Sequence, residues 1–252
     1  MKTNIITGFH AIEETVKSQS ENKNIDNTEN TTKIFYSKAG PRVKKILELA
    51  KKANIPCEKK TDRELNALVK NLPERLREHR GIVLSGKTPT RLSIDTLMAE
   101  FADKKSAFFV LLDSITDPHN IGSIIRSADQ LGVDAVILPE RNSAGGYEVI
   151  AKISSGASAW VPVIYVKNLI RVAQMLKREG FWIYGADGNG EDVHSINFAE
   201  KTVLVMGSEG KGIAQHLKDT CDKIVSIPTQ GRLDSLNVSV AAGILFYEIS
   251  RR

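Results

Sequence analysis

Three segments of the chain combine polar side chains and glycines at spacings that suit the binding of a small ligand. The first, residues 113–128, places Gly122 and Arg126 one helical turn apart. An arginine in that position can hold a phosphate group through two parallel hydrogen bonds. A structural ion pair with Asp129 or Asp113 explains the same residue, and from this segment alone the ion pair is the preferred interpretation.

The second segment, residues 206–212, has the sequence Met-Gly-Ser-Glu-Gly-Lys-Gly. Glycines let a ligand approach the main chain, and a helix that follows offers free N–H groups at its start. The spacing is neither that of a Walker loop nor that of the dinucleotide-binding fingerprint. Alone, this loop is a weak indication of a nucleotide-like ligand, and a surface position in a tight turn is the safer interpretation of Glu209.

The third segment, residues 227–248, begins where a predicted strand ends at Ile227. After a polar loop, we expect a helix to begin near Ser235, which is a suitable N-cap. This helix is apolar on almost every side, so we expect it to be buried in a core or in an interface between subunits. Asn237 lies in its first turn and needs hydrogen-bond partners there, either as a capping residue or as a ligand contact.

The elements around these segments predict an α/β domain. Helical patterns lie between most of six apolar runs that indicate buried strands, at 107–112, 135–138, 163–166, 181–186, 203–206 and 224–227. Strands that alternate with helices in this way form a parallel sheet covered on both faces. Because such sheets bind ligands at the carboxyl ends of their strands, we expect the three segments to lie at that edge.

The N-terminal part of the chain predicts a smaller α/β unit. Its expected elements are strands at 33–37, 55–58 and 82–85 and helices at 8–17, at 41–53 and from Thr61 or Asp62 to 71. The polar stretch 18–32 is expected to form a flexible loop. We therefore expect domains at 1–86 and 92–252, joined by a linker at 87–91.

The net charge of +5 is unevenly distributed along the 252 residues. Residues 1–91 hold 19 Lys and Arg against 11 Asp and Glu, whereas residues 92–252 hold 16 against 19. The basic part can bind a polyanion or can be a solvated basic surface, and charge alone favours neither.

No apolar run approaches the length of a membrane span and no signal-peptide region follows Met1, so we expect a cytoplasmic protein. Cys57 and Cys221 lack metal-ligand spacing, so we expect no metal.

Taken together, the three segments resemble the three motifs of the SpoU/TrmH RNA methyltransferases of the SPOUT superfamily, in order and in position. Residues 206–212 resemble motif 2, and residues 227–248 resemble motif 3 with Ser-Leu-Asn-Val-Ser-Val-Ala intact. The residues that match motif 1 are Asn120, Gly122, Arg126 and Ala128. Segments 8–12 (Gly-Phe-His-Ala-Ile) and 79–83 (His-Arg-Gly-Ile-Val) are similar to the 23S rRNA (guanosine-2′-O-)methyltransferases of this family, so the resemblance extends over nearly the whole chain.

This resemblance implies an N-terminal RNA-binding domain similar to ribosomal protein L30e and a C-terminal SPOUT α/β domain with a trefoil knot. It implies a homodimer that binds S-adenosylmethionine in the knotted loops, beside the dimer interface. The residues expected to contact the cofactor, largely through the main chain, are Gly207, Ile227 and Leu236. The residues that match the polar active-site positions are Asn120, Arg126, Glu209, Ser235 and Asn237.

The implied reaction is attack of a ribose 2′-hydroxyl on the methyl group of the cofactor, which requires alignment of three atoms and removal of a proton. In this family the arginine at the position of Arg126 is proposed as the base. Because a guanidinium has an ordinary pKa above about 12, we expect Arg126 to be essential and leave proton removal and phosphate positioning both open.

The expected function is 2′-O-methylation of a guanosine in 23S rRNA. A tRNA methyltransferase of the same family and a non-catalytic RNA-binding protein are the alternatives, and the presence of Arg126, Glu209 and Asn237 argues against the latter. The missing dinucleotide fingerprint argues against a nicotinamide enzyme. Two features depart from the family pattern: Thr229-Gln230 replace a common methionine and small residue, and the polar stretch 18–32 is longer than usual.

Overall fold

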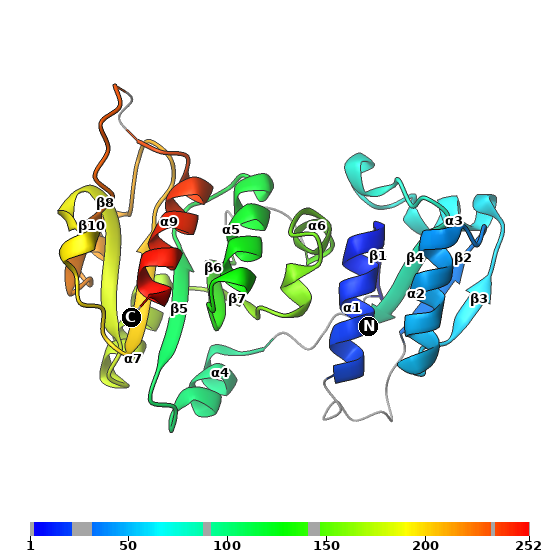
Figure 1. Cartoon of the computed structure of the whole chain (residues 1–252), viewed down its shortest axis with the longest axis horizontal. Coiled ribbons are helices and arrows are strands. Elements are labelled where there is room, and N and C mark those ends of the chain that lie inside the picture. The colour runs from blue at the N-terminus through cyan, green and yellow to red at the C-terminus, as the bar shows by residue number, and fades with distance from the viewer. Residues whose placement is uncertain (1–2, 22–31, 88–91, 141–146, 233–234, 252) are drawn as a thin grey trace. The chain divides into compact units, whose positions relative to one another are not determined.

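The computed structural model describes residues 3–21, 32–87, 92–140, 147–232 and 235–251 (Figure 1). Contacts group the chain into two units. Unit 1 comprises residues 1–90 together with 145–160, and unit 2 comprises residues 91–144 together with 161–252. The predicted linker at 87–91 and most of the predicted loop at 18–32 lie outside the described residues. The predicted domains, 1–86 and 92–252, stay a prediction.

Unit 1 contains a four-stranded sheet in the order β1-β4-β2-β3. Its elements in chain order are β1 (Thr3–Thr7), α1 (Phe9–Glu21), β2 (Lys33–Tyr36), α2 (Pro41–Lys52), β3 (Cys57–Lys59), α3 (Asp62–Val69), the 3₁₀ turn η2 (Glu74–Leu76) and β4 (Ile82–Lys87). β4 runs antiparallel to β1 and β2, while β2 and β3 are parallel. Helices α1 and α2 bury Ile12, Val16 and Ile46 in the same core as the strand residues Ile34 and Leu84.

Local signals in unit 1 explain where its helices begin. Pro41 occupies the first turn of α2, as predicted. Thr61 caps α3 in a reciprocal arrangement, because its hydroxyl accepts from the Glu64 amide while the Glu64 carboxylate accepts from the Thr61 amide.

The polar stretch 18–32 was predicted as a loop from its first residue, and this prediction is wrong for residues 18–21, which belong to α1. These polar residues find partners that a sequence pattern does not reveal. The hydroxyl of Ser18 donates to the carbonyl of Ala159 at 2.7 Å, and that of Ser20 donates to Lys17 at 2.7 Å.

Residues 147–160 follow the strand β6 (Ala135–Pro139) of unit 2 in the sequence but pack against α1 and β1 of unit 1. They form α6 (Tyr147–Ile153) and the 3₁₀ turn η3 (Ala157–Ala159). The indole of Trp160 donates to Glu14 at 2.9 Å, and the Lys152 ammonium donates to the carbonyl of Arg75 at 2.7 Å. A side chain on Gly156 would meet Glu14 at 2.7 Å, so this close approach requires glycine.

Unit 2 contains a six-stranded, fully parallel sheet in the order β10-β8-β9-β5-β6-β7. Its strands are β5 (Ala107–Leu112), β6 (Ala135–Pro139), β7 (Val163–Val166), β8 (Trp182–Asp192), β9 (Lys201–Met206) and β10 (Lys223–Ser226). Its helices are α4 (Ile94–Phe101), α5 (Pro118–Gln130), α7 (Leu169–Arg178), α8 (Gln215–Lys218) and α9 (Val238–Ser250), with the 3₁₀ turn η4 at Val193–Ser195. The predicted parallel α/β architecture is confirmed.

Helices cover both faces of this sheet. Apolar residues of α4, α7 and α8 share one core cluster with Phe109 and Leu111 of β5. On the other face, α5 and α9 lie side by side (Figure 1), and Phe246 of α9 meets Phe108 of β5 edge to face at 5.6 Å. The predicted apolar stripe of α5 is buried as expected at Ile121, Ile124, Ile125 and Ala128.

The strand order reverses beside β5. From β5 the chain continues outward through β6 and β7, and then returns on the other side of β5 through β8, β9 and β10. The loops that follow β5 and β9 are therefore neighbours at the carboxyl edge of the sheet, at the position where ligands bind in folds of this type. In the described residues no helix is long and apolar enough to cross a membrane. The trefoil knot stays a prediction.

Two details of α9 differ from prediction. The helix begins at Val238 with Asn237 as its N-cap, so Ser235 does not cap it. The expected burial on most sides is also incomplete, because Val240 is 52% exposed and Tyr247 is 54% exposed. The apolar sequence of α9 covers the sheet with one face and leaves an apolar face open.

Candidate functional site

A cavity of about 390 Å³ lies at the carboxyl edge of the unit 2 sheet. Five of the eight predicted site residues line it: Gly207, Glu209, Ile227, Ser235 and Leu236. Val225, Ala241 and Leu245 add apolar walls. The second and third sequence segments therefore meet at one cavity, as the position of their strands predicts.

The glycine-rich segment after β9 forms a closed loop. Ser208 and Gly212 pair through two main-chain hydrogen bonds, of 3.1 and 2.9 Å. A side chain on Gly207 would overlap the carbonyl group of Gly212, and Gly210 has a φ of +83°. Glycine is therefore required at both positions, and the closed loop presents Glu209 at its tip.

The Glu209 carboxylate joins all three segments. Its Oε1 accepts hydrogen bonds from the Asn120 side chain at 3.1 Å, from the Asn237 side chain at 2.7 Å and from the main-chain amide of Val238 at 3.3 Å. The Asn237 amide group also donates to Asn120 Oδ1 at 3.1 Å. Glu209 is thus held by groups from the starts of two helices, where a negative charge is stabilised.

Asn237 caps α9, which is one of the two roles left open by the sequence, while its contact with a ligand stays a prediction. Its Oδ1 accepts from the amide and the hydroxyl of Ser239, at 2.9 and 2.6 Å, and this caps α9. Its amide nitrogen faces Glu209 and Asn120 instead. The start of α9 is consequently fixed in position relative to the loop that carries Glu209.

Arg126 is exposed on α5 and does not line the cavity. Within the described residues its side chain has no hydrogen bond or ion pair, and the two candidate ion-pair partners are engaged elsewhere. Asp113 accepts from the Ala214 amide at 2.8 Å, and Asp129 accepts from Gln130 at 2.9 Å. The structural ion pair that the isolated segment favoured is therefore not found.

Sequence reasoning missed the contribution of the segment after Gly185. β8 pairs with β10 at Gly185 and then again from Glu191, so residues 186–190 leave the ladder, and the first three of them line the cavity. There Asp187 accepts from Lys218 at 2.7 Å and from the Asn189 amide at 3.0 Å, and these hydrogen bonds lower its pKa. The Asp-Gly-Asn-Gly sequence was a visible turn signal at this position.

Comparison with known proteins agrees with this geometry. Residues 107–247 match the SpoU rRNA Methylase family, and residues 5–85 match the family described as RNA 2′-O ribose methyltransferase substrate binding. The chain is 34% identical over 263 residues to the 23S rRNA (guanosine-2′-O-)-methyltransferase RlmB of Ralstonia nicotianae, which covers 100% of this chain and 96% of that protein. It is 39% identical over 227 residues to a Borreliella burgdorferi protein described as an uncharacterized tRNA/rRNA methyltransferase, over 87% of this chain and 97% of that protein.

The fold has solved counterparts as well. The SpoU methyltransferase AviRb from Streptomyces viridochromogenes, crystallised in complex with the cofactor AdoMet, superimposes with a TM-score of 0.77 at 23% identity, over 99% of this chain and 89% of that chain. The parallel sheet, its switch point and the glycine-lined cavity define an α/β protein with a cavity at the carboxyl edge of its sheet. The chain belongs to the SpoU rRNA methylase family, which confirms the resemblance found in its motifs.

Proposed function

We propose that this protein is an RNA 2′-O-ribose methyltransferase that uses S-adenosylmethionine and modifies a guanosine of 23S rRNA. The observation that carries the proposal is the Glu209 network, which joins the three motif segments beside a glycine-lined cavity. The relatives support it, because RlmB of Ralstonia nicotianae is named for this reaction and AviRb was crystallised with AdoMet.

The cavity fits S-adenosylmethionine in size and in chemistry. Small-molecule sites span about 300–1,000 Å³, and this one measures about 390 Å³. Leu236 and Leu245 provide apolar walls, Gly207 leaves its main chain accessible, and Glu209 adds a carboxylate that complements a positively charged sulfonium. When bound, this cofactor would supply a methyl group activated by the sulfonium.

The proposed work of the side chains is positioning. Asn120 and Asn237 fix the orientation of Glu209, and Ser235, which lines the cavity, is assigned a contact to the RNA ribose. Arg126 is assigned to the RNA at the reacting ribose, where it binds a phosphate or accepts the proton. Phosphate binding uses the donors of the guanidinium, whereas proton removal requires the neutral guanidine form. Both roles require a side chain that no other group engages, which agrees with its lack of side-chain partners in the described residues.

We also propose that the protein acts as a homodimer. Val240 and Tyr247 form an exposed apolar face on α9, and the exposed Leu236 precedes it. A second copy on this face would lie beside the cavity, because Leu236 lines that cavity too. We expect Val240→Glu to convert a dimer into a monomer in sedimentation experiments, and a wild-type protein that sediments as a monomer would contradict the proposal.

The proposed division of labour assigns RNA binding to residues 1–86 and methyl transfer to residues 92–252, without a metal. A protein that modifies rRNA is expected to act in the cytoplasm. A direct test incubates the purified protein with S-adenosylmethionine labelled in its methyl group and with transcripts of 23S rRNA and of tRNA. We expect the label at one guanosine ribose of 23S rRNA. Label in tRNA alone would favour the tRNA alternative, and label in neither would contradict the proposed function.

A further inference from the structure

Unit 1 brings together two sequence motifs, residues 8–12 and 79–83, that have no part in the cavity of unit 2. The first follows β1 and the second leads into β4. These strands are antiparallel neighbours with Thr7 opposite Val83, and β2 pairs with the same end of β4. The segments that follow β1 and β2 therefore meet the segment that precedes β4 at one end of the sheet.

A second cavity, of about 230 Å³, lies where these segments meet. Three cations line it, Lys38, Arg42 and Arg80, and its described lining contains no acidic residue. Phe9 and Pro41 give it an apolar wall. A basic cavity with an aromatic side is suited to an anionic ligand that also carries a planar or apolar group.

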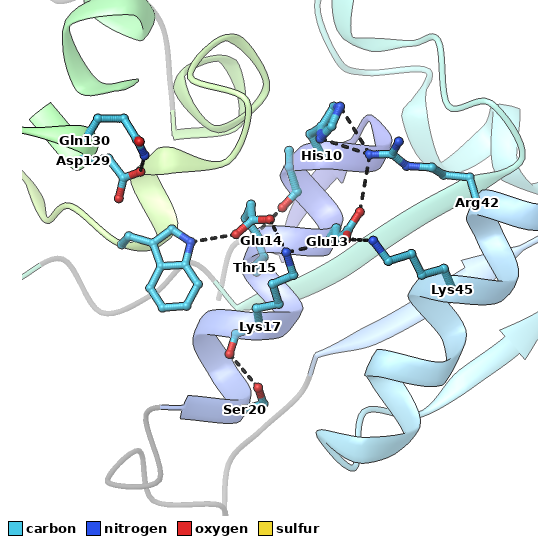
Figure 2. Close-up of polar contacts among 12 residues, drawn as sticks. His10, Glu13, Glu14, Thr15, Lys17, Ser20, Arg42, Lys45, Asp129 and Gln130 are labelled. Atoms are coloured by element: carbon cyan, nitrogen blue, oxygen red, sulfur yellow. Dashed lines mark hydrogen bonds and ion pairs between the residues drawn. The ribbon is translucent and has the colours of Figure 1, made fainter. Parts of the chain in front are cut away.

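Arg42 is anchored by a buried carboxylate (Figure 2). Its Nη2 lies 3.4 Å from Glu13 Oε2 and 3.1 Å from Nδ1 of His10, and Glu13 is 3% exposed. Glu13 also accepts from Lys45 at 2.8 Å and pairs with Lys17 at 3.6 Å, so three cations share one carboxylate. In the described residues the side-chain contacts of Arg42 all use Nη2, which leaves the Nε and Nη1 donors for a ligand.

The other two cations of the cavity each have one acidic partner but remain exposed. Arg80 pairs with Glu78 at 3.0 Å and its side chain is 59% exposed, and Lys38 pairs with Asp62 at 3.9 Å and its side chain is 86% exposed. The start of α2 adds positive potential, because its N-cap is Gly40 and no side chain caps it. The three cations thus line one cavity and remain accessible from solvent.

We propose that this cavity binds a backbone phosphate of the RNA substrate, with the adjoining ribose or base against Phe9. Two guanidinium groups suit a phosphate, and phosphate contacts position an RNA without specifying its sequence. The accessible cations favour a nucleic-acid strand that passes over the cavity rather than an enclosed free anion. The inference rests on the proposed function for the identity of its ligand, and residues 5–85 match a substrate-binding family.

The test compares two double variants that each remove two positive charges from the same part of the chain. The cavity variant is Arg42→Gln with Arg80→Asn, because Arg80 has a φ of +50° and asparagine tolerates that conformation. The control is Lys51→Gln with Lys52→Gln, two exposed lysines in the last turn of α2. They lie about 15 Å along the helix from Arg42.

The measurement is the dissociation constant for a 23S rRNA transcript as a function of salt. We expect the cavity variant to bind about tenfold or more weakly and the control about twofold or less. The slope of log affinity against log salt should fall by about 1 in the cavity variant, as expected for one lost phosphate contact. Equal weakening of both variants, or unchanged binding by the cavity variant, would overturn the proposal.

Further measurements separate the possible failures. Circular dichroism and cofactor affinity establish that the variants are folded. The single variant Arg80→Asn, at an exposed position, should also weaken RNA binding, by a smaller factor than the double variant. Displacement of RNA by micromolar inorganic phosphate would assign the cavity to a free anion and overturn the proposal. A wild-type protein that binds RNA without methylating it refutes the proposed function, while the comparison of the two variants still decides the role of the cavity.

Discussion

Each unit contains a glutamate on which contacts from more than one element converge, and these two glutamates, Glu13 and Glu209, have opposite surroundings. Glu13 in unit 1 is buried, and its side-chain partners in the described residues are all cations. Glu209 in unit 2 is exposed and accepts hydrogen bonds from neutral amides. The first carboxylate is neutralised by its partners, whereas the second is oriented by partners that leave its charge in place.

This difference matches the different ligands that we propose for the two units. Because the charge of Glu13 is balanced by its cationic partners, Glu13 can hold these cations in place without repelling an RNA phosphate. Unit 1 therefore stays basic. An uncompensated Glu209 adds negative charge to a cavity proposed for a sulfonium. The arginines differ in the same way, because Arg42 is anchored through Glu13 and Arg126 has no side-chain partner in the described residues. We therefore assign binding to Arg42 and the reaction to Arg126.

The largest expected effect follows from Arg126→Ala. We expect kcat to fall by about 10²–10³, the size of effect seen when one donor to a reacting group is removed, while cofactor affinity changes less than about twofold. Arg42→Gln should instead raise KM for RNA and leave kcat nearly unchanged. Steady-state kinetics with calorimetric cofactor titration measures both, and unchanged turnover in Arg126→Ala would refute its role.

A smaller loss of methyl-transfer activity is expected for Glu209→Gln, which keeps the shape of the side chain and removes its charge. We expect kcat/KM to fall by about 10- to 100-fold, because a hydrogen-bonded charge contributes about 1.5–3 kcal/mol. Its exposure limits the expected change in unfolding free energy to below about 1 kcal/mol. Glu179→Gln, an exposed carboxylate at the end of α7, serves as the control, and equal activity of the two variants would argue against the network.

For Glu13→Gln we expect the opposite of Glu209→Gln, with a larger effect on stability than on turnover. Removal of a buried charge that three cations share is expected to destabilise α1 by about 1–2 kcal/mol. Hydrogen exchange of the α1 amides measures this local free energy. The exposed Glu48→Gln on α2 is the matched control, and unchanged protection in Glu13→Gln would show that the cluster does not organise unit 1.

The smallest expected effect concerns Asp187, whose pKa is lowered by the hydrogen bonds from Lys218 and from the Asn189 amide. A carboxylate whose pKa is lowered by folding stabilises the protein at pH values above its ordinary pKa of 3.8. This contribution is lost as the pH falls through the pKa of the folded state. Asp187→Asn should therefore destabilise the cofactor-free protein by less than about 1 kcal/mol at pH 7. The difference should narrow as the pH falls below 3.8 in denaturation experiments, and parallel pH profiles would contradict this.

Elements with strong local signals could be predicted from the sequence, and those that depend on distant partners could not. The apolar run 107–112 and the Thr61 cap gave correct elements. β1 was not predicted, because Thr7 lies buried in it and its hydroxyl donates to Leu76, 69 residues away. A strand with polar residues at buried positions lacks the apolar pattern from which strands are predicted.

The candidate site in unit 2 was also only partly predictable from the sequence, because it depends on contacts between distant segments. Asn120 and Asn237 are 117 residues apart, and their shared contact with Glu209 could not follow from either segment alone. Resemblance to a family supplied that link. Asp187 was missed because its strand was expected to end at 186, and the return of β8 to the ladder at Glu191 is a property of the paired sheet.

The most direct test of the methyltransferase assignment is a map of 2′-O-methyl groups in the rRNA and tRNA of a strain that lacks this protein. We predict that one guanosine of 23S rRNA loses its methyl group, that the wild-type protein restores it, and that Arg126→Ala does not. An unchanged methylation map in the deletion strain, or full restoration by Arg126→Ala, would contradict the assignment.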